Sequence, residues 1–179
     1  MGIETRKICN FNVSKWHLIT TITPYISSKI NEGKKVKMIS EENMKNMAQM
    51  FLEKVILNNK KKKEIMSVNW ESKKNLIEYE KLDNYLKDMV KENNNISIII
   101  NGKRDFIEEI NSNINKWIKQ NEENKIEMDI INCYEIIGFS NVKDILDIHD
   151  KILNTSGEKD IEEVFEGYKE GDTNKLNAI

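Results

Sequence analysis

Residues 96–100, Ile-Ser-Ile-Ile-Ile, decide the fold. A nearly continuous run of β-branched residues predicts a strand that is buried on both faces, as the inner strands of parallel sheets are. Similar but less regular apolar runs occur before and after it. From these runs we expect further strands at 7–11, 36–39, 64–68 and 126–133.

Helical patterns separate these strands, because apolar residues recur at spacings of three and four. The apolar positions of the expected helices are Trp16, Ile19, Ile22, Ile26 and Ile30; Met44, Met47, Phe51, Val55 and Ile56; Leu76, Tyr79, Leu82, Leu86, Met89 and Val90; Phe106, Ile110, Ile114, Trp117 and Ile118; and Val142, Ile145, Leu146, Ile148 and Ile152. Pro24 predicts a kink in the first helix, and Gly33 predicts its end. Asp105 and Glu108 predict a capping box at the start of the fourth.

Strands that alternate with helices of ten or more residues predict repeated βαβ crossovers. We therefore expect an α/β fold, a three-layer sandwich with helices on both faces of a mainly parallel sheet of five strands or slightly more. The length of 179 residues fits one domain. We place this domain at residues 1–154, followed by a tail at 155–179 with a hinge at Gly157.

The charge balance excludes some classes of partner. A formal charge of −2 does not supply the basic face that nucleic-acid binding needs, so we expect no nucleic-acid partner. The densest basic run, 60–63, predicts a solvated turn rather than a phosphate or membrane-surface patch. No apolar run reaches the ~18 residues that span a bilayer, and the N-terminus has no signal-peptide pattern. We expect a cytoplasmic protein without a membrane partner, in which Cys9 and Cys133 are buried thiols.

The tail contains a candidate partner-binding helix. Asp160 and Glu163 form a capping-box pattern ahead of a short amphipathic segment. Its apolar residues are Ile161, Val164, Phe165 and Tyr168. This face packs either on its own domain or on a partner subunit, and the sequence leaves both alternatives open.

Ligands of parallel α/β sheets bind beyond the carboxyl ends of the strands. The candidate ligand-binding residues in those loops are Phe11, Asn12, Ser14, Trp16, His17, Glu41, Trp70, Arg104 and Tyr134. The aromatic members either line an apolar pocket or cover the edge of the sheet as core. The polar members either contact a ligand or serve as caps and solvated loop residues.

No catalytic motif is present in the sequence. The loop after the first strand has no glycine, whereas a phosphate-binding loop needs closely spaced glycines followed by Lys and Ser or Thr. Ser14 and Lys15 either contact an anion at a helix N-terminus or simply begin the helix. His17 and His149 lie far apart, and the charged neighbours of His149 predict a surface ion pair. We therefore expect no enzyme, no cofactor and no metal site.

Three stretches carry a resemblance to a known family. They are Ile-Cys-Asn-Phe at 8–11; Ile-Thr-Pro-Tyr-Ile at 22–26 with Glu-Gly-Lys-Lys-Val at 32–36; and Asn-Cys-Tyr-Glu at 132–135 with Phe139 and with Ile-Leu-Asp at 145–147. In these stretches the chain resembles the MEDS-type sensory domains of bacteria and archaea, which look like degenerate relatives of the RecA/KaiC-type P-loop ATPases. It departs from the family at Lys7 and Asn12, which stand where a histidine and an aromatic are usual, and it lacks the His-Pro after the last helix.

The resemblance implies a RecA-like fold without a phosphate loop and a sensor that binds a small organic ligand. Its output then runs through a separate regulatory protein, by way of the tail helix or a homodimer face. We expect a non-catalytic sensory or regulatory binding protein that senses a small ligand or docks a signalling or transcriptional partner. The alternatives are a protein-protein interaction module without a small ligand and a nucleotide-binding protein with an atypical site.

Overall fold

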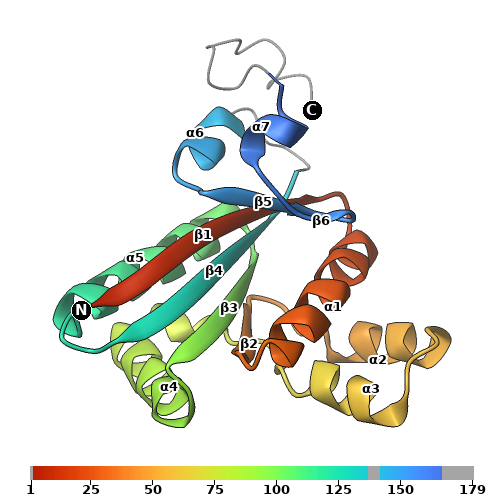
Figure 1. The fold of residues 1–179 in the computed structure, drawn as a ribbon, viewed down its shortest axis with the longest axis horizontal. Coiled ribbons are helices and arrows are strands. Elements are labelled where there is room, and N and C mark those ends of the chain that lie inside the picture. The colour runs from red at the N-terminus through yellow and green to blue at the C-terminus, as the bar shows by residue number, and fades with distance from the viewer. Residues whose placement is uncertain (1, 137–141, 167–179) are drawn as a thin grey trace.

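The computed structural model describes residues 2–136 and 142–166, and these form one mixed sheet with helices on both of its faces (Figure 1). The elements, in chain order, are β1 (Ile3–Asn12), α1 (Lys15–Asn31), β2 (Lys35–Ser40), α2 (Lys45–Lys54), α3 (Asn59–Met66), the 3-10 helix η1 (Lys74–Ile77), α4 (Tyr79–Glu92), β3 (Asn95–Gly102), α5 (Arg104–Gln120), β4 (Ile126–Glu135), α6 (Val142–Asp147), β5 (Lys151–Asn154), β6 (Gly157–Lys159) and α7 (Ile161–Val164). The strand order is β2-β3-β4-β1-β5-β6. The α/β class is confirmed, and the six strands of the described residues agree with the expected five or slightly more.

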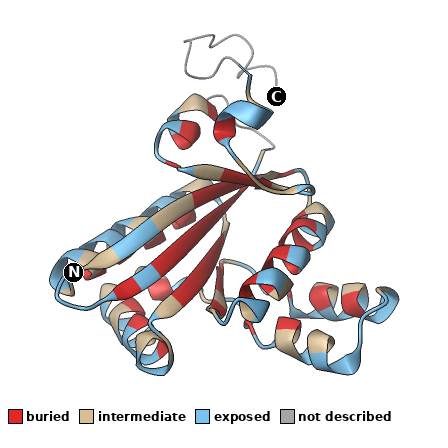
Figure 2. Ribbon diagram, in the orientation of Figure 1, coloured by how far each residue is buried: buried red, intermediate tan, exposed pale blue. Residues whose placement is uncertain are grey.

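The sheet is parallel except for the last pair. β1 pairs in parallel with β4 and β5, β3 pairs in parallel with β2 and β4, and β5 and β6 form an antiparallel hairpin. The strand at 96–100 is β3, which lies between β2 and β4 and is buried on both faces, as predicted (Figure 2).

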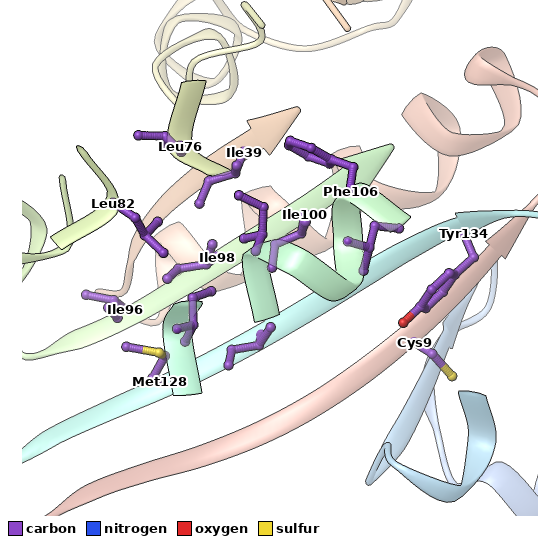
Figure 3. Close-up of a cluster of buried hydrophobic side chains, with 14 of the residues drawn as sticks. Cys9, Ile39, Leu76, Leu82, Ile96, Ile98, Ile100, Phe106, Met128 and Tyr134 are labelled. Atoms are coloured by element: carbon purple, nitrogen blue, oxygen red, sulfur yellow. The ribbon is translucent and has the colours of Figure 1, made fainter. Parts of the chain in front are cut away.

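Each face of the sheet has its own apolar core, because successive side chains of a strand point to opposite faces. Ile8, Ile99 and Ile131 pack under α1, α2 and α3. On the other face Ile98 and Ile130 pack with residues of α4, α5, α6 and α7. Figure 3 shows part of this second core, which also contains the predicted site residue Tyr134. The helices of the two faces lie on opposite sides of the sheet in Figure 1.

The predicted third strand at 64–68 is wrong, because these residues form the last turn of helix α3 and the turn that follows it. Asn58 caps α3 through a hydrogen bond that its side-chain oxygen accepts from the amide of Lys61. The lysines at 60–63 favour a helix because long unbranched side chains lose little rotamer freedom in it. They therefore lie in α3 and not in a turn. Only Ile65 of this helix is buried.

The outer edge of β2 is covered by the segment after α3. The carbonyl of Val68 accepts a hydrogen bond from the amide of Met38, and the carbonyl of Ser40 accepts one from the amide of Lys73. An irregular segment thus stands where a third strand was predicted.

The predicted helix through 142–152 is too long. α6 ends at Asp147, Ile148 is exposed, and Ile152 lies in β5. The β5–β6 hairpin crosses the boundary that the sequence suggested between residues 154 and 155. Gly157 begins β6 with a φ of 104°, a conformation that glycine adopts without strain.

The predicted helix ends are confirmed in part. α1 runs without interruption through Pro24, and Gly33 follows it with a φ of 83°. The capping box of Asp160 with Glu163 is present at α7. The capping box at Asp105 is wrong, because α5 already begins at Arg104 and Lys103 is its N-cap residue.

Candidate functional site

The carboxyl edge of the sheet is a topological switch point. β1 and β4 are neighbours, but β1 leads to α1 on one face, whereas β4 precedes α6 on the other. Ligands of open α/β sheets bind at such points. The predicted mouth of the site therefore lies where the fold favours one.

The aromatic side chains at this mouth pack against one another and against the rest of the chain. The rings of Phe11 and Tyr134 lie 6.0 Å apart, and Phe165 meets the Phe11 ring edge-on at 6.3 Å. Tyr134 is buried, and both rings belong to the core under α5, α6 and α7. The alternative in which these aromatics cover the sheet edge as core describes them correctly.

The polar side chains near the start of α1 bond to other groups of the chain. Asn12 is buried and donates its side-chain amide to the carbonyl of Tyr134 at 3.1 Å. The Ser14 hydroxyl accepts the amide of His17, and the His17 ring accepts the amide of Val13 at 3.2 Å. Lys15 pairs with Glu42. Two of the backbone amides near this helix N-terminus, those of Val13 and His17, are thus already engaged within the chain.

Within the described residues, the other predicted ligand residues lie in separate surroundings. Trp16 is 41% exposed, whereas Trp70 is buried under α2 and donates its indole N–H to the carbonyl of Ile65 at 2.9 Å. Glu41 accepts the amide of Lys103 at 2.7 Å. Arg104 pairs with Glu108 one turn further along α5.

The candidate partner helix packs on its own domain. Ile161 is buried, and Phe165 lies against Phe11. Val164 is 39% exposed, while Tyr168 and Phe139 lie outside the described residues. Of the two alternatives for this helix, the structure shows the intramolecular one.

A different surface offers an open cavity. A groove of about 760 Å³ lies over β1 between α5 and the turn after α6, and we name it the polar groove. Its lining consists of Lys7, Glu108, Asn111, Ser112, Asn115, Lys116, Lys119, Gln120, Tyr134 and Ile148. Tyr134 is the one predicted site residue in this lining.

The polar groove is positively charged. Three lysines line it, at positions 7, 116 and 119. Glu108, the acidic residue of the lining, is held by Arg104 at 2.7 Å. The Lys116 ammonium lies 3.9 Å from the centre of the Tyr79 ring. Within the part of the chain that the structure describes, the ammonium groups of Lys7 and Lys119 form no ion pair.

A hydrogen-bond network fixes the wall of the groove to the sheet. Asn111 of α5 and Asn132 of β4 exchange two side-chain hydrogen bonds, of 2.7 and 3.2 Å. Asn132 also lies 2.9 Å from Nε2 of His149, and Nδ1 of this histidine lies 2.5 Å from the carbonyl of Ile145. Since a carbonyl only accepts, Nδ1 carries the proton and Nε2 accepts from the Asn132 amide.

His149 is therefore a buried neutral residue, and the predicted surface ion pair is wrong. Burial lowers its pKa, and the nearby Lys7 lowers it further, against the opposing effects of the Ile145 carbonyl and Asp150. Its ring also meets the Tyr134 ring edge-on at 6.0 Å. The histidine holds α6 against β4 and positions one side of the groove.

The two cysteines are not activated as nucleophiles. Burial raises the pKa of the Cys9 thiol to about 12 and also raises that of Cys133, so neither is a thiolate at neutral pH. Residues 2–136 and 142–166 contain no group of three or more His, Cys, Asp or Glu residues that could hold a metal ion. Within the same residues, every helix is too short or too polar to cross a bilayer.

The comparisons with known proteins give no relative. No family model, no curated protein and no solved structure matches the chain. The function must therefore be argued from the site alone.

The sequence did contain a signal for the polar groove. Asn111, Asn115 and Lys119 recur every four residues and form a polar stripe along α5. Asparagine and lysine are abundant throughout the chain, so this stripe does not differ in composition from ordinary solvated surface. The missing information was that α6 and β1 turn one side of this stripe into the wall of a groove.

Proposed function

We propose that this chain is a non-catalytic regulatory protein that senses a small organic anion in the polar groove. The observation that carries the proposal is the pair of lysines, Lys7 and Lys119, that line the groove without a carboxylate partner among the described residues. Positive charges that are not neutralised within the protein attract negatively charged ligands.

The size and polarity of the groove define the ligand class. Its volume of about 760 Å³ lies in the range of small-molecule sites. The lysine ammonium groups donate hydrogen bonds to carboxylate or phosphate oxygens. The amides of Asn115 and Gln120 provide neutral donors and acceptors, and the Tyr134 ring provides apolar contact. A compact organic body with one or two carboxylate or phosphate groups fits this set.

The architecture supports a sensor that is related to the MEDS type and to RecA-like ATPases. The parallel strands β2, β3, β4, β1 and β5, with helices on both faces, are compatible with a RecA-like core. The loop before α1 lacks glycines, and the amides of Val13 and His17 are engaged by side chains of the same segment, which supports a role without nucleotide hydrolysis. We propose that this sensor acts in the cytoplasm and signals through a separate protein.

Thermal unfolding of the full chain tests this function. We would measure Tm against a panel of organic carboxylates and phosphate monoesters, with ATP and Mg²⁺ as a nucleotide arm and glucose as the uncharged control. A ligand at 100 times its Kd stabilises the native state by about 2.7 kcal/mol. We expect an organic anion to raise Tm by several degrees and glucose to have no effect.

A matched pair of charge variants locates the effect. The Lys7→Gln, Lys119→Gln double variant should lose the anion-induced shift. A Lys45→Gln variant removes a charge on α2, away from the lining of the groove, and should keep the shift. The proposal fails if no organic anion raises Tm, if the double variant responds like the wild type, or if a nucleotide shift depends on Lys15 instead.

A further inference from the structure

A second groove lies among α1, α2 and α3, on the face of the sheet opposite to the polar groove. We name it the apolar groove, and its volume is about 540 Å³. Its lining consists of Thr23, Pro24, Ser27, Ser28, Asn31, Phe51, Val55, Ile56, Leu57 and Ile65. The helices that form it stand apart from α5 and α6 in Figure 1.

The apolar groove presents apolar side chains to solvent. Ile56, between α2 and α3, is fully exposed, and its neighbour Leu57 is 37% exposed. Phe51 and Val55 are partly buried against the core beneath. Burying one such side chain fully at an interface contributes about 1.5–3 kcal/mol. This surface therefore provides an apolar anchor for a partner.

The segment that carries Val55, Ile56, Leu57 and Ile65 of the groove lining is rich in lysine, and we name its lysines the lysine rim. Residues 54–64 contain five lysines and one acidic residue, Glu64. Lys61 reaches across to Asn31 of the groove lining and also pairs with Glu64 at 3.3 Å. After this pairing the rim keeps a strong positive charge next to an apolar surface.

We infer that the apolar groove docks an acidic amphipathic helix of a partner protein. Apolar side chains of such a helix, at spacings of three and four, meet Phe51, Val55 and Ile56, and its acidic side chains face the lysine rim. This output surface is independent of the proposed sensing function, because the two grooves share no residue.

The lysine rim argues against a second copy of this chain as the occupant. A twofold dimer places the same patch on both sides of the interface. Two lysine rims would then face each other, and like charges across an interface cost several kcal/mol. The rim thus selects a partner of the opposite charge.

The groove lining favours a protein over a lipid surface, and a helix over a strand. Thr23 and Ser28 of α1 hydrogen-bond within the chain, to the carbonyl of Ile19 and the carboxylate of Glu32. Ser27 and Asn31 also line this side, and burial under acyl chains would remove water from their polar groups. Strand addition needs a free sheet edge, but the edge of β2 next to these helices is covered by the segment from Val68 to Lys73.

A display selection with a library of helix-constrained peptides tests this inference on the full chain. We expect enriched peptides to combine Glu or Asp with apolar residues at positions i, i+3 or i+4, and i+7. The Kd of an enriched peptide should rise at least tenfold in an Ile56→Asp variant. It should also rise severalfold with Lys60→Glu, Lys62→Glu and with salt.

A Val13→Asp variant is the matched control, because Val13 is also an exposed β-branched residue and does not line either groove. It should bind the peptide as the wild type does, and thermal unfolding should show that both variants fold. The inference is overturned if enriched peptides are not acidic, if Ile56→Asp binds normally, or if this face instead mediates self-association or binding to phosphatidylserine vesicles.

Discussion

Arg6 and Lys7 are neighbours on β1, yet their side chains enter opposite environments. Arg6 pairs with Asp129 at 2.9 Å and with Glu158 at 2.7 Å, and Lys34 joins Asp129 at 2.7 Å. We name these four residues the closed cluster. Lys7, on the other face, lines the polar groove. The alternation of one strand thus places one positive charge in an internal ion pair and leaves the other for a ligand.

The closed cluster shows what internal neutralisation does to a buried acid. Burial alone would raise the pKa of Asp129, but hydrogen bonds from Arg6 and Lys34 hold it below its ordinary value. The strands provide the geometry, because Arg6 and Asp129 stand opposite each other in the register of β1 and β4. Charges that are paired in this way stabilise the fold. Lys7 and Lys119 of the polar groove are instead available to bind a ligand.

Breaking the closed cluster should give the largest loss of stability. Asp129→Ala leaves Arg6 and the largely buried Lys34 without their shared carboxylate, and breaking such a pair costs about 3 kcal/mol. Chemical denaturation measures this loss. Glu127→Ala, on an exposed residue of the same strand, should change stability by less than about 0.5 kcal/mol. Equal effects of the two variants would contradict a special role for the cluster.

Removing the network behind the polar groove should have the next largest effect. Asn132→Leu leaves Nε2 of His149 without its donor and removes both hydrogen bonds to Asn111, which keeps its bond to the Ile107 carbonyl. We expect a cost of about 2 kcal/mol. Asn115→Leu, on the exposed part of the same groove, should leave the free energy of unfolding nearly unchanged. If Asn132→Leu is equally neutral, the network does not hold the groove.

The pH dependence of stability should be smaller and should depend on His149. Its pKa is lowered in the native state, so the unfolded state binds the proton more tightly. Stability is then complete above the unfolded pKa of about 6.5 and falls as the pH drops below it, by at most about 1.4 kcal/mol per pH unit.

Urea unfolding between pH 7.5 and 5 measures this slope. His149→Gln should flatten it, and His17→Gln should retain it. A slope that disappears with His17→Gln instead would show that the wrong histidine has been assigned.

The smallest change in stability should come from substituting Lys7, the lysine of β1 that lines the polar groove. Lys7→Gln removes a charge that has no internal partner among the described residues, and we expect a change within about 0.5 kcal/mol. Differential scanning calorimetry without ligand checks this. A loss comparable to that of Asp129→Ala would mean that Lys7 serves the fold, and the contrast between the two faces would then be lost.

The sequence predicted the long elements well and the short ones poorly. β3 was recognisable because its β-branched run requires burial on both faces. α3 was missed because Glu64 to Val68 reads as a strand locally, although the Asn58 cap and the lysines at 60–63 favour a helix. The β5–β6 hairpin was missed because its strands have only four and three residues, too few for a period to be recognised.

The candidate site was harder to predict because it depends on contacts between distant residues. Tyr134, a predicted ligand residue, lines the polar groove. His149 was predicted to form a surface ion pair because its sequence neighbours are charged. Its burial depends on Asn132, which is close only after β4 and α6 come together. In the same way, the sequence left open whether the aromatic residues form a pocket or core, because the packing of Phe165 on Phe11 is not visible in it.

The central claim, that an organic anion binds in the polar groove, is tested most directly by NMR on the ¹⁵N-labelled full chain. The titrant is the anion that gives the largest increase in Tm. The account predicts that saturable amide shifts concentrate at Lys7, Asn111, Asn115 and Lys119, and that the Lys7→Gln, Lys119→Gln variant loses them. Shifts centred instead on Ser14 and Lys15, or on Val55 to Leu57, would contradict it.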